Sequence, residues 1–169
     1  MKEDNKVIRL IYTFFLGLLL AIFIGVGINS FYVSPAAPEF PNELNTYGKD
    51  MTEEQVALQN EYDQNMESYH KNQSGPYNRN VSIMTLSAAV VLLALSMFLE
   101  KKKIKVVADG IMLGGLFTLI YSIGRGFASQ NTKYTFLTVT IGLVIVLYLG
   151  YHRFVREHNP EVKISKNKS

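Results

Sequence analysis

Four long blocks of the sequence contain almost no charged side chains, and they constrain the fold more than any other feature. The chain has 17 Lys and Arg residues and 14 Asp and Glu residues, of which only Asp109 and Arg125 lie within the blocks. A soluble helix of 18 or more residues needs a polar face, which these blocks mostly lack. They therefore predict membrane-spanning segments and exclude a compact soluble enzyme. The blocks are residues 10–32, 81–99, 106–127 and 134–152.

The connections after the second and third blocks are short, at residues 100–105 and 128–133. Short connections make consecutive helices antiparallel, and helices satisfy their own backbone hydrogen bonds in lipid. We therefore predict an all-α membrane protein with an antiparallel bundle of four transmembrane helices, plus one extracytoplasmic amphipathic helix. The first block follows a basic start, but it is longer than the roughly 7–15-residue apolar region of a signal peptide, so we expect a retained anchor.

Basic residues are divided unevenly between the two sides of this bundle. The N-terminal residues 1–9, the turn at 100–105 and the tail at 153–169 hold twelve Lys and Arg residues, against five on the opposite side. Because short cytoplasmic segments carry an excess of basic residues, both termini are predicted to be cytoplasmic, in a multi-pass protein of a plasma (inner) membrane. The basic rim predicts contact with anionic lipids at the cytoplasmic face. A short tail is not a folded nucleic-acid-binding module, so no nucleic-acid partner is expected.

The long segment at residues 33–80 is predicted to lie outside the cytoplasm. Pro35, Pro38 and Pro41 recur every three residues, which is one turn of a polyproline II helix. The repeat predicts an extended, stiff strut that leaves the membrane. A docking site for a proline-recognising partner is the alternative interpretation.

A match to the capping box, Thr52-Glu53-Glu54-Gln55, predicts the start of a helix in this segment. The helix is predicted over about residues 53–71 and is expected to be stopped by Gly75-Pro76. Its apolar side chains form a single stripe, which cannot make a core alone. The membrane surface, the outer end of the bundle, another copy of the chain or a partner protein must therefore cover it. This candidate interaction surface consists of Leu58, Tyr62, Met66 and Tyr69.

The chain contains no cysteine, which excludes thiolate nucleophiles, thiolate zinc sites and cysteine-ligated iron–sulfur clusters. The three histidines show no ligand spacing, and no set of catalytic side chains is evident on one side of the membrane. No catalytic, metal-binding or cofactor-binding residue is therefore predicted. The sequence favours a non-enzymatic interaction, scaffold or complex-accessory protein that acts through its outer helix, with a protein partner or a homo-oligomer.

The third block carries the polar groups expected within the membrane. Asp109 and Arg125 are 16 residues apart, about 24 Å along a helix, so they cannot pair with each other. Lys105 precedes Asp109 by four residues and is able to pair with it across one helical turn. A polar face on this helix suggests the alternative function, a small oligomeric transporter or channel. The candidate intramembrane polar site consists of Asp109, Thr118, Ser122 and Arg125.

Small residues recur at intervals of four in two of the blocks, a spacing that lets membrane helices approach closely. We therefore expect the helices of residues 10–32 and 106–127 to pack on each other. The predicted packing residues are Gly17, Ala21, Gly25, Gly110 and Gly114.

The segments Ala108-Asp109-Gly110, Leu113-Gly114-Gly115, Tyr121 and Arg125-Gly126-Phe127 carry a resemblance to a known group. They resemble small, uncharacterised four-span bacterial membrane proteins over about 20 residues. The resemblance implies a bacterial inner-membrane setting and no particular activity.

Overall fold

The computed structural model describes residues 4–44 and 51–155, and these residues form helices and no strands. Four helices are long and apolar enough to cross a membrane, so the predicted number of apolar helices of spanning length is confirmed. Residues 45–50 of the predicted outer segment and residues 156–169 of the predicted tail lie outside the described residues. The four helices are α1 (Asp4–Phe31), α3 (Gly75–Lys101), α4 (Lys105–Ala128) and α5 (Thr132–Gly150).

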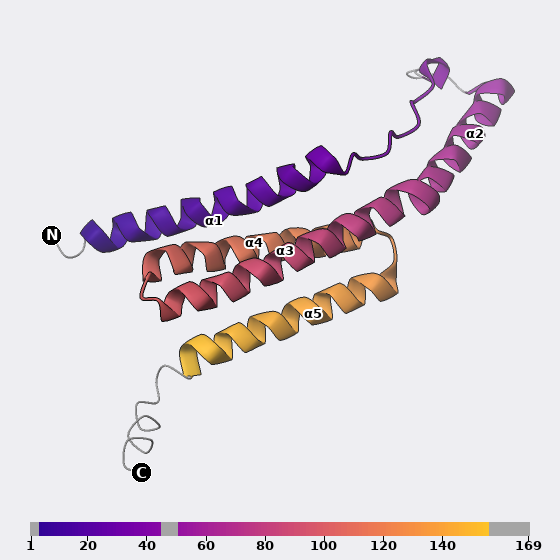
Figure 1. The fold of residues 1–169 in the computed structure, drawn as a ribbon. Helices are drawn as coiled ribbons and strands as arrows, with labels where there is room; N and C mark the ends of the chain where they lie inside the picture. Colours follow the sequence, from indigo (N-terminus) through magenta and orange to yellow (C-terminus); the bar gives the residue numbers. More distant parts are fainter. Residues whose placement is uncertain (1–3, 45–50, 156–169) are drawn as a thin grey trace, which may run out of the picture.

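Helix α4 is the central element, because it packs along both α3 and α1 and also contacts α5 (Figure 1). In the most apolar stretch of each helix, 39% of the residues of α4 are buried, against 6% for α1. Helix α5 buries only Thr138 and Gly142, and it lies on the other side of the α3–α4 pair from α1. The core of the described chain therefore lies between α3 and α4, and α1 and α5 pack against this pair.

Small polar side chains join α3 to α4 through hydrogen bonds between the helices. The Ser82 hydroxyl donates to the Ser122 carbonyl at 2.8 Å, and the Ser122 hydroxyl donates to the Ser82 carbonyl at the same distance. Near the other end of the pair, the Ser96 hydroxyl donates to the Ala108 carbonyl at 2.9 Å. Small hydroxyl residues permit a close approach of the two backbones and bond across the contact.

The predicted end of the outer helix at Gly75-Pro76 is wrong. Helix α2 (Glu53–Tyr69) continues through a π-helical turn, η2 (His70–Ser74), directly into α3, so that Glu53–Lys101 is one helical run of 49 residues. Pro76 occupies the first turn of α3, where the missing N–H of proline costs least. The wider turn before it keeps the chain helical, because the Gly75 N–H donates to the His70 carbonyl five residues earlier.

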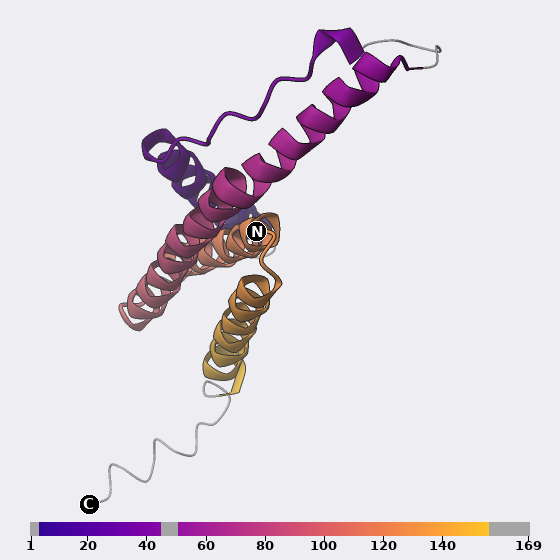
Figure 2. The same cartoon turned by 90° about the vertical axis from the view of Figure 1, so that its right-hand side faces the viewer.

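Helix α2 projects beyond the other helices, and we refer to it as the arm (Figures 1 and 2). It begins at the predicted capping box, in which the Thr52 hydroxyl accepts from the Gln55 N–H and the Gln55 side chain accepts from the Thr52 N–H. Residues 33–44, which we call the strut, leave α1 and run beside the arm to a short 3₁₀ turn, η1 (Asn42–Leu44). The strut is thus extended, as predicted, but it lies along the arm.

Candidate functional site

The apolar stripe of the arm is covered in part by the strut, which the sequence did not suggest. The Phe40 ring meets the Tyr62 ring edge to face, with centroids 5.3 Å apart. The Tyr69 hydroxyl donates to the Pro35 carbonyl at 3.0 Å. All four stripe residues, Leu58, Tyr62, Met66 and Tyr69, are half-buried. The expected covers of the stripe, which were lipid, the bundle end, a second copy and a partner, are therefore incomplete, because the strut covers part of it. In the sequence, Phe40 and Leu44 were the apolar residues of the strut that could have indicated this contact with the arm.

The remaining surface of the arm is strongly acidic. Between Glu53 and Tyr69 there is no Lys or Arg, so the arm carries only negative charge. Its acidic side chains are all exposed. Two of them lie in the first helical turn, where negative charge interacts favourably with the helix dipole. The exposed acids are Glu53, Glu54, Glu61, Asp63 and Glu67.

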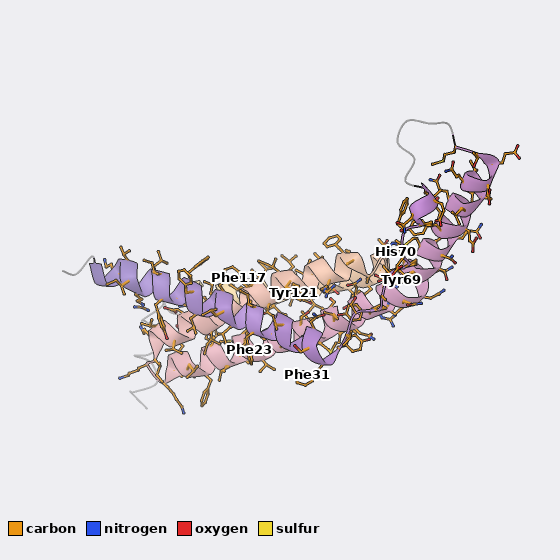
Figure 3. The ribbon with its side chains drawn as sticks, turned by 90° about the horizontal axis from the view of Figure 1, so that it is seen from above. Phe23, Phe31, Tyr69, His70, Phe117 and Tyr121 are labelled. Carbon is orange, nitrogen blue, oxygen red and sulfur yellow. The ribbon has the colours of Figure 1, made fainter. Side chains whose placement is uncertain are left out.

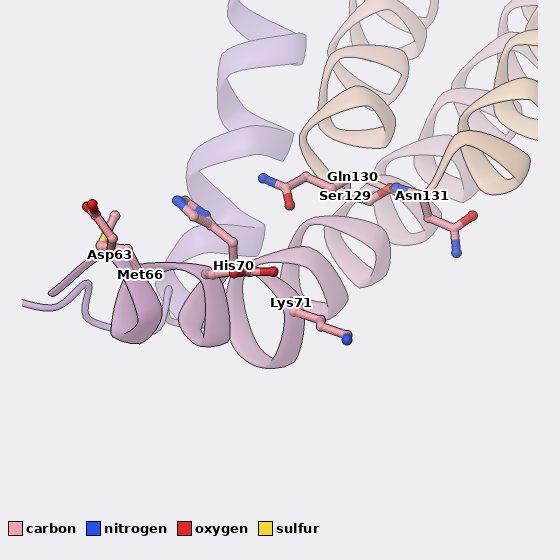
Figure 4. A pocket seen from close by; sticks show the side chains of 8 residues that line it. Asp63, Met66, His70, Lys71, Ser129, Gln130 and Asn131 are labelled. Atoms are coloured by element: carbon pink, nitrogen blue, oxygen red, sulfur yellow. The ribbon is translucent and has the colours of Figure 1, made fainter. Parts of the chain in front are cut away.

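An open pocket of about 730 Å³ lies between the end of the arm that joins η2 and the turn that joins α4 to α5 (Figure 4). His70 and Lys71 of η2 and Gln130 and Asn131 of the turn line it, and Figure 4 shows the His70 and Gln130 side chains near one another. Gln130 has a positive φ of 55°, and Asn131 caps α5 by accepting from the Tyr134 N–H. Within residues 4–44 and 51–155, no group of three or more His, Asp or Glu residues is placed to hold a metal ion. Asp63 and Glu67 of the arm also line the pocket, so acidic, basic and amide groups face it together.

Arg125 stands three residues before the end of α4 and joins α4 to α3 at the arm end of the molecule. Its Nη1 donates to the Asn78 side-chain oxygen at 2.7 Å, and its Nε donates to the Tyr121 hydroxyl at 3.0 Å. The guanidinium carbon also lies 5.5 Å from the ring centroids of both Tyr77 and Tyr121, within cation–π range. The arginine is therefore held in a fixed position by an amide and two aromatic rings.

The end of α1 is fixed to α3 by a neighbouring tyrosine pair. The Tyr32 and Tyr77 rings are stacked, with centroids 5.0 Å apart and planes 3° apart. The Tyr77 hydroxyl donates to the Tyr32 carbonyl at 3.1 Å, and the Asn80 amide donates to the Tyr32 hydroxyl at 2.9 Å. These contacts fix the start of the strut against α3.

Asp109 occupies the opposite end of α4 and binds two arginines from distant parts of the chain. Arg9 of α1 donates to one carboxylate oxygen at 2.7 Å, and Arg153, which follows α5, donates to the other. Lys105, which the helical spacing makes able to pair with Asp109, forms no ion pair with it in the described chain, whereas two arginines from outside α4 do. Helical spacing identifies only partners on the same helix, so Arg9 and Arg153 were missed.

The four residues of the predicted intramembrane polar site are not brought together. Thr118 and Ser122 are 1% and 0% exposed, and both are used in packing. The Thr118 hydroxyl donates to the Gly114 carbonyl, and Ser122 bonds to Ser82 on α3. Asp109 and Arg125 hold opposite ends of α4. A continuous polar path along this helix is not formed in the described chain.

The predicted close contact between the first and third spanning segments is present at Gly17. A Cβ atom at this position would lie 2.9 Å from the Leu113 Cβ and 3.0 Å from the Gly114 nitrogen. A Cβ atom at Gly110 would lie 2.6 Å from the Leu16 side chain. Gly25 does not belong to this contact, because its nearest neighbour would be a Tyr121 ring carbon at 4.0 Å. The helices α1 and α4 therefore separate from Gly17 toward the arm end.

The separation leaves a groove of about 560 Å³ between α1 and α4. Ala21, predicted as a helix-packing residue, lines this groove and does not close the space between the two helices. Phe117 and Tyr121 border the groove on α4, and Figure 3 shows both where α4 lies beside α1. Arg125 and Asn29 lie at its arm end.

Comparison of the chain with protein-family models, with curated proteins and with solved structures found no match.

Proposed function

We propose that the chain is a multi-pass protein of a bacterial inner membrane with both termini in the cytoplasm. The distribution of basic residues supports this orientation, since twelve of the 17 Lys and Arg residues fall on the side of the termini. Short turns join α3 to α4 and α4 to α5, which supports an antiparallel bundle. In this orientation the arm lies outside the cytoplasm and Asp109 lies near the cytoplasmic face.

We further propose that the protein works by contact and not by catalysis, as a membrane-anchored scaffold or accessory subunit that presents the arm. The observation that carries this proposal is the continuous helix from the arm into α3. A rigid helical connection holds the arm at a fixed position beyond the spanning helices. Its exposed face is acidic and its apolar stripe is already half-covered, which favours a partner with a basic surface.

The alternative function, an oligomeric transporter or channel, has less support. Thr118 and Ser122 are two of the four polar residues on which it was based, and both are buried with their hydroxyls bonded to backbone. A transport path would have to use other groups. We therefore retain the contact function as the proposal.

The proposal is tested by photo-crosslinking in cells. A photo-reactive residue replaces Gln64, which is exposed on the arm between Glu61 and Glu67. We expect a defined heavier band that is absent when the same residue replaces Leu143, an exposed position on α5. The mass of the band separates a second copy of the chain from a different protein.

Charge neutralisation identifies the recognised surface. The triple variant Glu61→Gln, Asp63→Asn, Glu67→Gln keeps the shape of the arm, and we expect the crosslinked band to weaken by about fivefold or more because charge complementarity drives encounter. Asn60→Ala, on the same face and without a charge, should leave the band unchanged. A full-strength band from the triple variant, or no heavier band at Gln64, would contradict the proposal.

A further inference from the structure

The groove between α1 and α4 combines an apolar wall with a cation at one end. Its lining along α1 extends from Leu18 to Asn29, which are eleven residues apart, or about 16 Å along the helix axis. That length is about half of a hydrocarbon core of about 30 Å, and it lies in the half of α1 nearer the arm. The groove therefore has the length of one membrane leaflet.

Arg125 at the end of this groove has unused hydrogen-bonding capacity. Among the described residues, only its Nε and Nη1 have protein acceptors, although a guanidinium has five N–H donors. The ion pairs formed within the described part of the chain both belong to Asp109, so Arg125 has no carboxylate partner there. A cation three residues from the end of a spanning helix lies at the level of the lipid headgroups, where an anionic phosphate can pair with it.

A second donor stands beside the arginine. Asn29 lines the same end of the groove, and its side-chain oxygen lies 3.3 Å from the Tyr77 hydroxyl, whose single proton is shared with the Tyr32 carbonyl at 3.1 Å. Its amide nitrogen has no acceptor among the described residues, so it can donate outward. An arginine and an amide donor together suit the oxygen atoms of a phosphate group.

We propose that this groove binds one anionic phospholipid of the outer leaflet, with its phosphate at Arg125 and Asn29 and one acyl chain along Gly25, Ala21 and Phe117. The inference rests on the membrane placement given under the proposed function. The proposed lipid site differs from the attraction of anionic lipids to the basic cytoplasmic rim, because it is a single site at the opposite face of the membrane. The lipid fills the space that the separation of α1 from α4 leaves open.

The test uses the full chain purified in mild detergent and titrated with phosphatidylglycerol or phosphatidylcholine, with bound lipids counted by native mass spectrometry. We expect one tightly bound phosphatidylglycerol beyond those at the rim and at least tenfold weaker binding of phosphatidylcholine there. Glycerol phosphate, which has the headgroup chemistry without acyl chains, should not bind. Binding of glycerol phosphate at the same level would show an anion site and overturn the lipid assignment.

Two variants and two matched controls locate the site. Arg125→Gln removes the cation, and we expect about tenfold weaker binding of that one lipid. Arg79→Gln removes a charge from an exposed position on α3 outside the groove and should bind normally. Gly25→Leu fills the groove and should expel the lipid, and it is expected to fold because a Cβ atom there meets nothing closer than 4.0 Å. Gly27→Leu, at a glycine with open space outside this groove, should retain the lipid.

The outcomes separate this inference from the proposed function. If Arg125→Gln and Gly25→Leu both keep the extra lipid, the groove is not its site and the inference fails while arm crosslinking stands. A dimer mass that Gly25→Leu abolishes would assign the groove to a second copy of the chain instead. If alkaline extraction releases the chain from membranes, the membrane placement fails, and the lipid site fails with it.

Discussion

Asp109 and Arg125 are the two charged residues within the four blocks of low charge, and each is held by groups from other helices. The carboxylate of Asp109 accepts from Arg9 and Arg153, which come from opposite ends of the chain. The guanidinium of Arg125 is held by Asn78 of α3 and by Tyr121. One charge therefore has two ionic partners, whereas the other has only neutral ones. This difference means that Asp109 is paired with cations of the chain itself, whereas Arg125 has no anionic partner among the described residues.

Neutralising the carboxylate should loosen the contact that joins both chain ends to α4. We expect Asp109→Asn to lower the stability by about 1–2 kcal/mol, since it weakens two charge-assisted hydrogen bonds. The effect is smaller than for a fully buried pair because the Arg9 side chain is 46% exposed. In thermal unfolding in mild detergent, the midpoint should fall by about 2–8 °C. Lys105→Gln is the control, and an equal loss in that variant would favour the same-helix pair.

At the scale of the elements, contact between α1 and α4 depends on glycine at one crossing point. At Gly17 the atoms that a Cβ would meet include the Gly114 nitrogen at 3.0 Å and the Gly110 carbonyl oxygen at 3.1 Å. Backbone atoms cannot move aside as a flexible side chain can, so the whole helix must shift. The same helix has open space at Gly25 and Gly27. Helix α1 therefore packs closely against α4 at Gly17 and forms one wall of the groove nearer the arm.

Alanine substitution along α1 tests this division. Gly17→Ala should cost about 1–3 kcal/mol of stability because the added methyl group separates two backbones. Gly27→Ala should be neutral or slightly stabilising, since alanine favours a helix and nothing lies within 4 Å. Both changes add the same methyl group and the same helix propensity, so their difference isolates packing. The measurement is unfolding of the two variants in one detergent, and equal midpoints would contradict the crossing at Gly17.

At the scale of the whole molecule, the sequence predicts the four long apolar helices well and the contacts between them less well. Long runs without charge need no knowledge of neighbours, so the four apolar helices could be placed from the chain alone. Gly75-Pro76 is read locally as a helix stop, but a π turn and the position of Pro76 in a first turn let the helix continue. The cover of Tyr62 by Phe40 and the pairing of Arg9 with Asp109 join residues far apart in sequence. Local spacing carries no information on such contacts.

The continuous run from the arm into α3 makes a prediction about distance across the whole molecule. Because the chain has no cysteine, spin labels can be attached at two introduced cysteines without removing others. Labels at Glu61 and Val90, both exposed and 29 residues apart, should give one narrow distance at or slightly below about 43 Å. A pair of labels at Ile83 and Phe98 within α3, about 22 Å apart, sets the width of the distance distribution expected for an unbroken helix.

Inserting Gly-Gly after Ser74 should broaden only the long distance, because it introduces a hinge beside η2. A short or broad distribution in the parent chain would mean that the arm swings about Gly75-Pro76, and the fixed presentation on which the proposed function depends would be lost.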